Sequence, residues 1–80
     1  MSTKTWSKIN NAEFGRFVSI GAQVLDKIDE LGGTHDLISV EEYDSSRTII
    51  REWPTLESAN LWCEWLLKTF PNAEVKILSE

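Results

Sequence analysis

The sequence predicts a single α+β domain over residues 1–80, with its elements in the order strand, helix, strand, strand, helix, strand. The chain has 80 residues, of which 41% are hydrophobic and 26% are charged, and a second independent core would need roughly 50 residues more. Hydrophobic residues recur with helical spacing in two segments and alternate as in strands elsewhere. Glycines and prolines fall where the spacing changes, so they separate the elements.

The first strand and the first helix are expected within the first 33 residues. Around Thr5–Ile9 side chains alternate as in a strand. A helix is expected over 11–31, capped by Asn10 with Glu13 as its reciprocal partner and stopped by Gly32-Gly33. Its apolar stripe is Phe14, Phe17, Val18, Gly21, Val24, Leu25, Ile28 and Leu31. Gly21 on this stripe predicts a close approach of the helix to the sheet.

The next two strands are expected to form a hairpin from 35–43 and 47–53, joined by a turn at 44–46. A two-residue loop would invert the faces of one strand relative to the other. We favour a three-residue loop, because it groups Ile38, Val40 and Ile50 on one apolar face. The opposite face then carries a mixed set of side chains: His35, Leu37, Glu41, Tyr43, Arg47, Ile49, Arg51 and Trp53.

A second helix is expected from Thr55, as its N-cap, to about Phe70, bounded by Pro54 and Pro71. Leu61 and Trp65 are spaced i and i+4 and lie off its core stripe. We interpret these two residues as a patch for a partner, with ordinary surface exposure as the alternative. The alternating residues 74–78 predict the last strand.

This order of elements is that of the ferredoxin-like plan, in which two helices cover one face of a four-stranded antiparallel sheet. The other face starts uncovered. If that face carries Leu37, Ile49, Trp53, Tyr43 and charged residues, it is too apolar to stay in water. A homodimer is therefore expected.

The run from Thr48 to Trp62, a strand ending in Trp53 followed by Pro-Thr and a helix with Glu-x-Ala-x-x-Trp, resembles the dimeric α/β-barrel superfamily. This superfamily includes the antibiotic-biosynthesis monooxygenase-like domains. The resemblance implies a homodimeric barrel of face-to-face sheets, with a small apolar ligand between sheet and helices in the enzymes. Haem-degrading relatives use a histidine on the second helix, which has none here, so no haem chemistry and no cofactor are expected.

The net charge of −5 is concentrated between Asp26 and Asp44, where seven acidic residues and one lysine give −6. An acidic stretch repels phosphate backbones, so nucleic acid is not an expected partner. One cysteine and one histidine exclude a disulfide and a Cys/His zinc cluster. No apolar run is long enough to cross a bilayer, and no signal peptide is evident, which predicts a cytoplasmic protein without membrane contact.

No catalytic motif is recognisable, so an enzyme is not the favoured interpretation. His35 and Arg51 are the weak candidates for acid–base or polar roles, with a strand-edge residue and an ion-pair partner as the alternatives. Three functions follow as hypotheses. The first is a homodimer that binds a small apolar ligand, the second is an acidic protein that occupies a basic site on a host protein, and the third is a cofactor-free monooxygenase.

Overall fold

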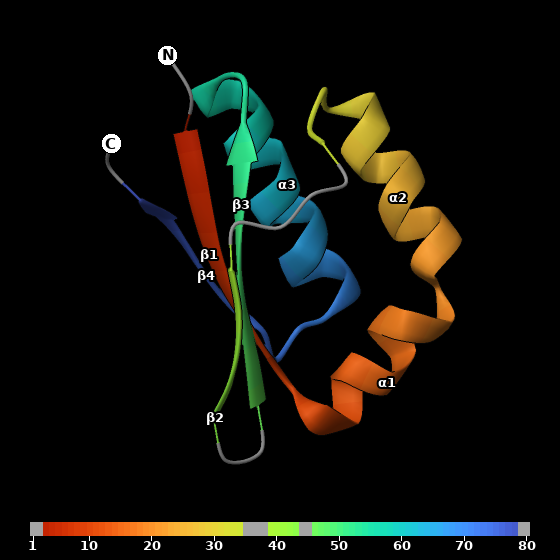
Figure 1. Ribbon diagram of the computed structural model, residues 1–80. Coiled ribbons are helices and arrows are strands. Elements are labelled where there is room, and N and C mark those ends of the chain that lie inside the picture. The colour runs from red at the N-terminus through yellow and green to blue at the C-terminus, as the bar shows by residue number, and fades with distance from the viewer. Residues whose placement is uncertain (1–2, 35–38, 44–45, 79–80) are drawn as a thin grey trace.

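Three helices cover one face of a four-stranded sheet in the computed structural model (Figure 1). The structure describes residues 3–34, 39–43 and 46–78, the segment 39–43 by its backbone alone. The strands are β1 (Thr3–Asn10), β2 (Ser39–Tyr43), β3 (Ser46–Trp53) and β4 (Glu74–Leu78), and the helices are α1 (Asn11–Ser19), α2 (Gly21–Glu30) and α3 (Leu56–Thr69).

The sheet is antiparallel and has the strand order β2-β3-β1-β4, with β1 and β3 at its centre. This α+β arrangement is consistent with the ferredoxin-like plan and confirms the predicted alternation of strands and helices. The core lies between the helices and the sheet. It includes Ile9 from β1, Trp53 from β3 and Trp62, Leu66 and Phe70 at and after α3.

The expected single helix over 11–31 is two helices, α1 and α2, that meet at Ile20. The hydroxyl of Ser19 donates to the carbonyl oxygen of Arg16 at 2.9 Å, and such a bond back to the preceding turn bends a helix. Gly21 follows at once and has low helix propensity. The chain therefore changes direction here, and α2 runs at an angle to α1 (Figure 1).

Both predicted ends of this helical region are confirmed, but the reciprocal bond from the Glu13 side chain is not, since its Oε1 is buried without a hydrogen-bond partner among the described residues. The side chain of Asn10 accepts a hydrogen bond from the backbone of Glu13 at 2.8 Å. At the other end Gly32 has φ of 80°, and the N–H groups of Gly32 and Gly33 donate to the carbonyls of Asp29 and Ile28. These two bonds form a Schellman motif.

The close approach to the sheet occurs at Gly33, and the prediction for Gly21 is wrong. A Cβ on Gly33 would lie 2.6 Å from Cζ3 of Trp53, whereas a Cβ on Gly21 would meet nothing within 4 Å. The turn after α2 is thus packed on the end of β3, while the start of α2 is not in contact with the sheet.

The helix α3 begins and ends close to the predicted residues. The Thr55 hydroxyl accepts from the backbone N–H of Ser58 at 3.0 Å, which confirms the N-cap. One face of the helix is buried through Ala59, Trp62, Cys63 and Leu66.

The hairpin has a two-residue connection, so the predicted register is wrong. Tyr43 pairs with Ser46, and Val40 pairs with Ile49. On β3 the faces are therefore opposite to those expected. Ile49, Arg51 and Trp53 are buried on the side of the helices, while Ile50 is half-buried on the other side.

The size of the side chains explains this choice of face. Burying a tryptophan removes about 150–250 Å² from water, worth roughly 4–6 kcal/mol at about 25 cal/mol per Å². Trp53 and Ile49 together outweigh Ile50 on the other face. Because neighbouring residues of a strand alternate in direction, turning Trp53 and Ile49 toward the helices also turns Arg51 there. The burial of a cation thus follows from the burial of its apolar neighbours.

Candidate functional site: an aromatic row with a buried arginine

Six aromatic rings form a continuous row between the sheet and the helices. Ring centroids are 5.0 Å apart for Trp53–Trp62, 5.4 Å for Trp62–Trp65 and 6.4 Å for Trp65–Phe70. The row continues through Phe17 to Phe14 at 5.6 Å and 5.4 Å. Such offset and edge contacts are favourable ring geometries. The row joins the end of β3 to α1 through α3.

Three arginines contact this row. Arg51 lies over Trp62 with its Cζ 5.6 Å from the ring centroid, Arg47 over Phe14 at 4.4 Å, and Arg16 over Phe70 at 4.7 Å. Arg16 also donates to the carbonyl of Thr69 and so ties α1 to the end of α3. These cation–π contacts place positive charge along an apolar interior.

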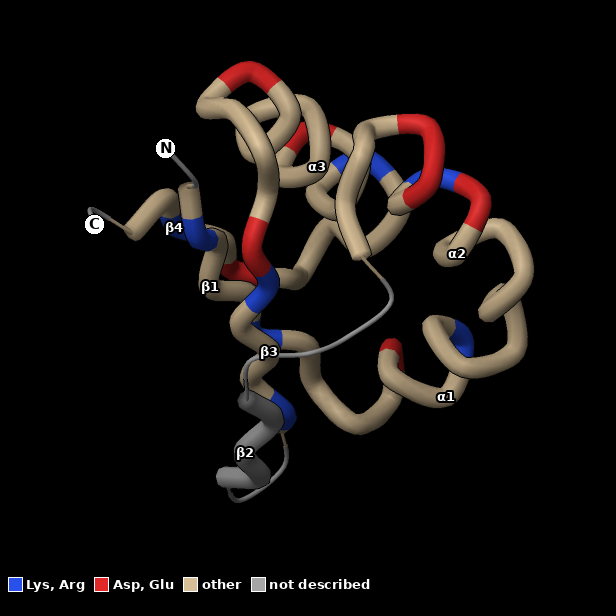
Figure 2. Tube along the Cα trace, turned by 45° about the horizontal axis from the view of Figure 1, so that its top comes forward, with Lys and Arg blue, Asp and Glu red and all other residues tan. Residues whose placement is uncertain are grey.

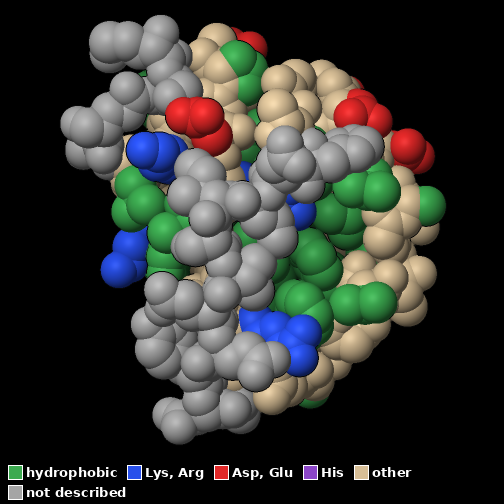
Figure 3. Space-filling view, in the orientation of Figure 1, with side chains coloured by type: hydrophobic (Ala, Val, Ile, Leu, Met, Phe, Trp, Pro, Cys, Tyr) green, Lys and Arg blue, Asp and Glu red, His purple; other side chains and the backbone are tan. Residues whose placement is uncertain are grey.

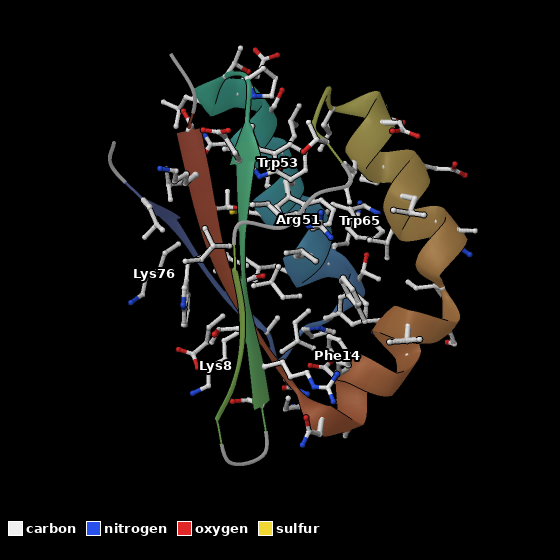
Figure 4. The ribbon with its side chains drawn as sticks, in the orientation of Figure 1. Lys8, Phe14, Arg51, Trp53, Trp65 and Lys76 are labelled. Atoms are coloured by element: carbon white, nitrogen blue, oxygen red, sulfur yellow. The ribbon has the colours of Figure 1, made fainter. Side chains whose placement is uncertain are left out.

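Arg51 differs from the other two in its burial. Its side chain extends from β3 to the helix side, where Figure 4 shows it and Trp65 in the same space between β3 and the helices. Arg51 is only 7% exposed, and the atoms Nε and Nη1 have no hydrogen-bond partner in the part of the chain that the structure describes. Desolvation lowers the pKa of this guanidinium from its usual value.

A groove of about 480 Å³ lies between α2 and α3. This volume falls within the range of roughly 300–1,000 Å³ found for small-molecule sites. Trp65 of the aromatic row is one of its walls, so the groove and the row are continuous. The lining residues are Lys27, Leu61, Glu64, Trp65, Leu67 and Lys68. A second hollow, of about 200 Å³, lies beside Gly33, Trp53 and Pro54 and is smaller than that range.

The structure brings together part of the predicted set of site residues. Ile49, Arg51 and Trp53 lie on one face of β3, as predicted, but this face points to the helices (Figure 4). The expectation that they form the uncovered face is therefore wrong. The predictions for His35 and Leu37, and for the side chains of Glu41 and Tyr43, lie outside the described residues. Leu61 and Trp65 line the same groove, and their role as a partner patch stays a prediction.

The uncovered face of the sheet carries a different set of residues. Trp6 and Ile50 pair across the two central strands, and both are half-buried. Nζ of Lys76 lies 4.7 Å from the centroid of the Trp6 ring. Lys8 forms an ion pair with Glu74 at 3.9 Å between Nζ and Oε2. Figure 4 shows Lys8 and Lys76 on the side of the sheet away from the helices.

Charges of both signs occur in both layers. Figure 2 shows acidic positions grouped along α2, and basic and acidic positions along the strands. In Figure 3 hydrophobic and basic side chains face the viewer in the space between the sheet and the helices. Of the predicted acidic stripe, Asp26, Asp29 and Glu30 lie exposed on α2. Asp36 and Asp44, and the side chains of Glu41 and Glu42, lie outside the described residues.

Other chemical groups give no further site in the described segments. Cys63 is buried, as expected of a small core residue, and desolvation raises the pKa of its thiol. Within residues 3–34 and 46–78 no three His, Cys, Asp or Glu side chains are grouped so as to hold a metal ion. No helix of the described chain has the length and hydrophobicity needed to cross a membrane.

Sequence reasoning missed the phenylalanines of the row and Trp6. Phe14 and Phe17 belong to the predicted helical stripe, but only the fold brings them to Phe70. Trp6 was identifiable from the alternation of β1, where Trp6 and Lys8 oppose Ser7 and Ile9. The polar side chains of Thr5 and Ser7, both buried, concealed which face of this strand is covered.

No family model matches the chain, and no curated protein matches it. The functional assignment therefore depends on the geometry of the aromatic row, the groove and Arg51.

Proposed function

We propose that this chain is a small-ligand-binding domain that holds an apolar or aromatic ligand in the groove between α2 and α3. The observation that carries the proposal is the groove of about 480 Å³ whose wall, Trp65, stacks on the buried Trp62. Pockets for small molecules are mostly apolar and contain a few polar groups. Leu61, Trp65 and Leu67 form the apolar wall of this groove, and Lys27, Glu64 and Lys68 supply its polar groups.

Leu61 and Leu67 on α3 are 44% and 43% exposed at the groove. A ligand that covers them would remove apolar surface from water, which favours binding.

Binding of neutral aromatic probes, such as indole and 2-naphthol, to the full chain tests this proposal. The indole N–H resonance of Trp65 should shift on titration by NMR, and Leu61→Asp should weaken binding at least tenfold. Leu56→Asp is the matched control, because Leu56 lies on the same helix, is 56% exposed and does not line the groove. Equal weakening by both substitutions, or an unchanged Trp65 signal at millimolar probe, would contradict the proposal.

We also propose that two copies pair through the uncovered face of the sheet, as the resemblance to the dimeric α/β-barrel superfamily implies. Trp6 and Ile50 lie side by side on the central strands and are half-buried in one copy. A closed two-fold pair would cover them. Sedimentation at micromolar concentration should give a dimer, and Ile50→Glu should give a monomer. Val18→Glu, on the exposed outside of α1, should leave the dimer intact.

Neither the hypothesis of an acidic inhibitor nor that of a cofactor-free monooxygenase is favoured by a specific observation. The first depends largely on acidic side chains outside the described residues, and the second depends on His35, which also lies outside them. Both stay hypotheses.

A further inference from the structure

Trp65 connects the groove between α2 and α3 to the aromatic core. Its ring is stacked on the buried Trp62, with the centroids 5.4 Å apart and an interplanar angle of 22°. Phe70, also buried, meets it edge to face at 6.4 Å between centroids. Trp65 is nevertheless only half-buried, and it lines the groove of about 480 Å³. The part of the indole that these two rings leave uncovered therefore belongs to the groove.

This arrangement favours an aromatic ligand over a saturated one. Pairs of aromatic rings gain free energy beyond the area that they bury, whereas a saturated ring of the same outline gains only the burial. Because Trp62 and Phe70 hold the indole of Trp65 in place, the indole loses little conformational freedom when a ligand binds. Trp65 is also the only aromatic residue among the described residues that line the groove.

The charges that line the groove balance once the ion pair of Lys27 is counted. Nζ of Lys27 lies 2.8 Å from Oε2 of Glu30, so this cation has its counter-charge within α2. Glu64 and Lys68 remain, one of each sign and four residues apart on α3, which places them on the same side of the helix. A ligand with a net charge would lose to one of these groups what it gains from the other, and it would also lose hydration. The groove therefore favours an uncharged ligand.

We infer that the ligand of this groove is an uncharged, planar aromatic molecule whose ring packs against Trp65 and extends the aromatic row by one ring. This inference rests on the proposed function, since it names the chemical class of the ligand for the same groove. The exposed side chains of Leu61 and Leu67 add apolar surface to the same lining. Trp65 is then the residue that determines the specificity.

A pair of probes with the same outline tests the preference for an aromatic ring. Calorimetry compares 2-naphthol with decahydro-2-naphthol on the full chain, and we expect 2-naphthol to bind about three- to tenfold more tightly. Hydrophobic burial alone predicts no such preference, since the saturated probe presents at least as much apolar surface. Equal or tighter binding of the saturated probe would overturn the inference and leave the proposed function standing. Failure of both probes to bind would overturn both.

Substitutions of Trp65 show whether the preference comes from its ring. Trp65→Leu should remove the preference and leave the binding of decahydro-2-naphthol within about twofold, whereas Trp65→Phe should keep the preference. Trp6→Leu is the matched control, because it replaces a tryptophan on the uncovered face of the sheet, and it should leave the preference unchanged. A preference that survives in Trp65→Leu would contradict the role of this residue.

Charged probes with the same ring test the second part of the inference. We expect 2-naphthoate and 2-naphthylmethylammonium each to bind at least about threefold more weakly than 2-naphthol at neutral pH. Glu64→Gln should strengthen the binding of 2-naphthoate relative to the ammonium, and Lys68→Met should do the reverse. Equal or tighter binding of either ion to the unsubstituted chain would overturn the assignment of an uncharged ligand. So would an order of the two ions that neither substitution changes, because these side chains would then not act on the ligand.

Discussion

The two faces of the sheet carry cations in opposite surroundings. On the helix side Arg51 is desolvated, lies over Trp62 and has, among the described residues, no acceptor for two of its nitrogens. On the other side Lys8 has Glu74 as a partner and Lys76 lies over Trp6, both near solvent. The sheet thus holds a desolvated cation on its inner face and two cations close to solvent on its outer face.

This difference shows that the positions of the aromatic rings determine how far each charged side chain is hydrated. Trp53 and Trp62 exclude water from the inner face, so a guanidinium there loses its hydration. Trp6 covers only part of the outer face, and water remains available to the lysines.

The largest expected effect is a difference in the loss of stability when Trp53 and Trp6 are each replaced by alanine. Trp53→Ala should lower the free energy of unfolding by about 3–5 kcal/mol, because it opens a cavity in the core. Trp6→Ala, on the outer face, should lower it by about 1 kcal/mol. Urea unfolding measures both. If Trp53→Ala does not fold, Trp53→Phe should still fold and lose about 1 kcal/mol with the bond to Thr5. Equal losses for the two tryptophans would remove the distinction between the faces.

The next effect concerns the tight packing at the end of the inner face. Gly33→Ala should cost about 1–3 kcal/mol, since its Cβ would overlap the Trp53 ring. Gly15→Ala is the control, because a Cβ at Gly15 would meet nothing within 4 Å. It should raise stability by about 0.5–1 kcal/mol through helix propensity. Thermal unfolding of both variants measures these changes in stability. An unchanged stability of Gly33→Ala would mean that the Trp53 ring shifts readily to make room.

A smaller effect is expected for the ion pair of the outer face. A double-mutant cycle of Lys8→Met and Glu74→Gln should give a coupling below about 1 kcal/mol that disappears at 1 M salt. The partners are exposed and 3.9 Å apart. A coupling that persists at high salt would show that this face is dry, as in a tight dimer.

The smallest effect concerns pH and Cys63. Burial raises the pKa of this thiol above its ordinary value of 9.0, so the folded state favours the neutral thiol. Its contribution to stability is fully present below pH 9.0 and is lost as the pH rises through the folded-state pKa. Cys63→Ala should therefore unfold with a weaker pH dependence above pH 9 than the parent protein. Identical alkaline profiles would contradict the burial of the thiol.

Much of the fold was predictable because its signals are local. The caps at Asn10 and Thr55 and the stop at Gly32-Gly33 are short-range hydrogen-bond patterns, and each is present. The break at Ile20 was not predicted, because the apolar stripe continues through it. The bond from Ser19 to Arg16 that bends the helix is visible only in the folded chain.

The candidate site was predictable only in part. The sequence identified Ile49, Arg51 and Trp53 as one face of a strand, because alternation is a property of the strand itself. It did not identify whether that face points toward the helices or toward the uncovered side of the sheet. In Thr48–Ile50 two apolar residues are adjacent, so the pattern fits either face, and one residue of loop length reverses the answer.

By itself the sequence determined the types, the order and most of the ends of the elements, apart from the break at Ile20. These depend on spacing and capping within a few residues. The tertiary structure alone decided that Trp53 turns inward, that Arg51 is carried inward with it, and that the aromatic rings join into one row. The physical reason is that the choice of face is settled by total apolar burial across strands and helices far apart in the chain, a sum that no local segment contains.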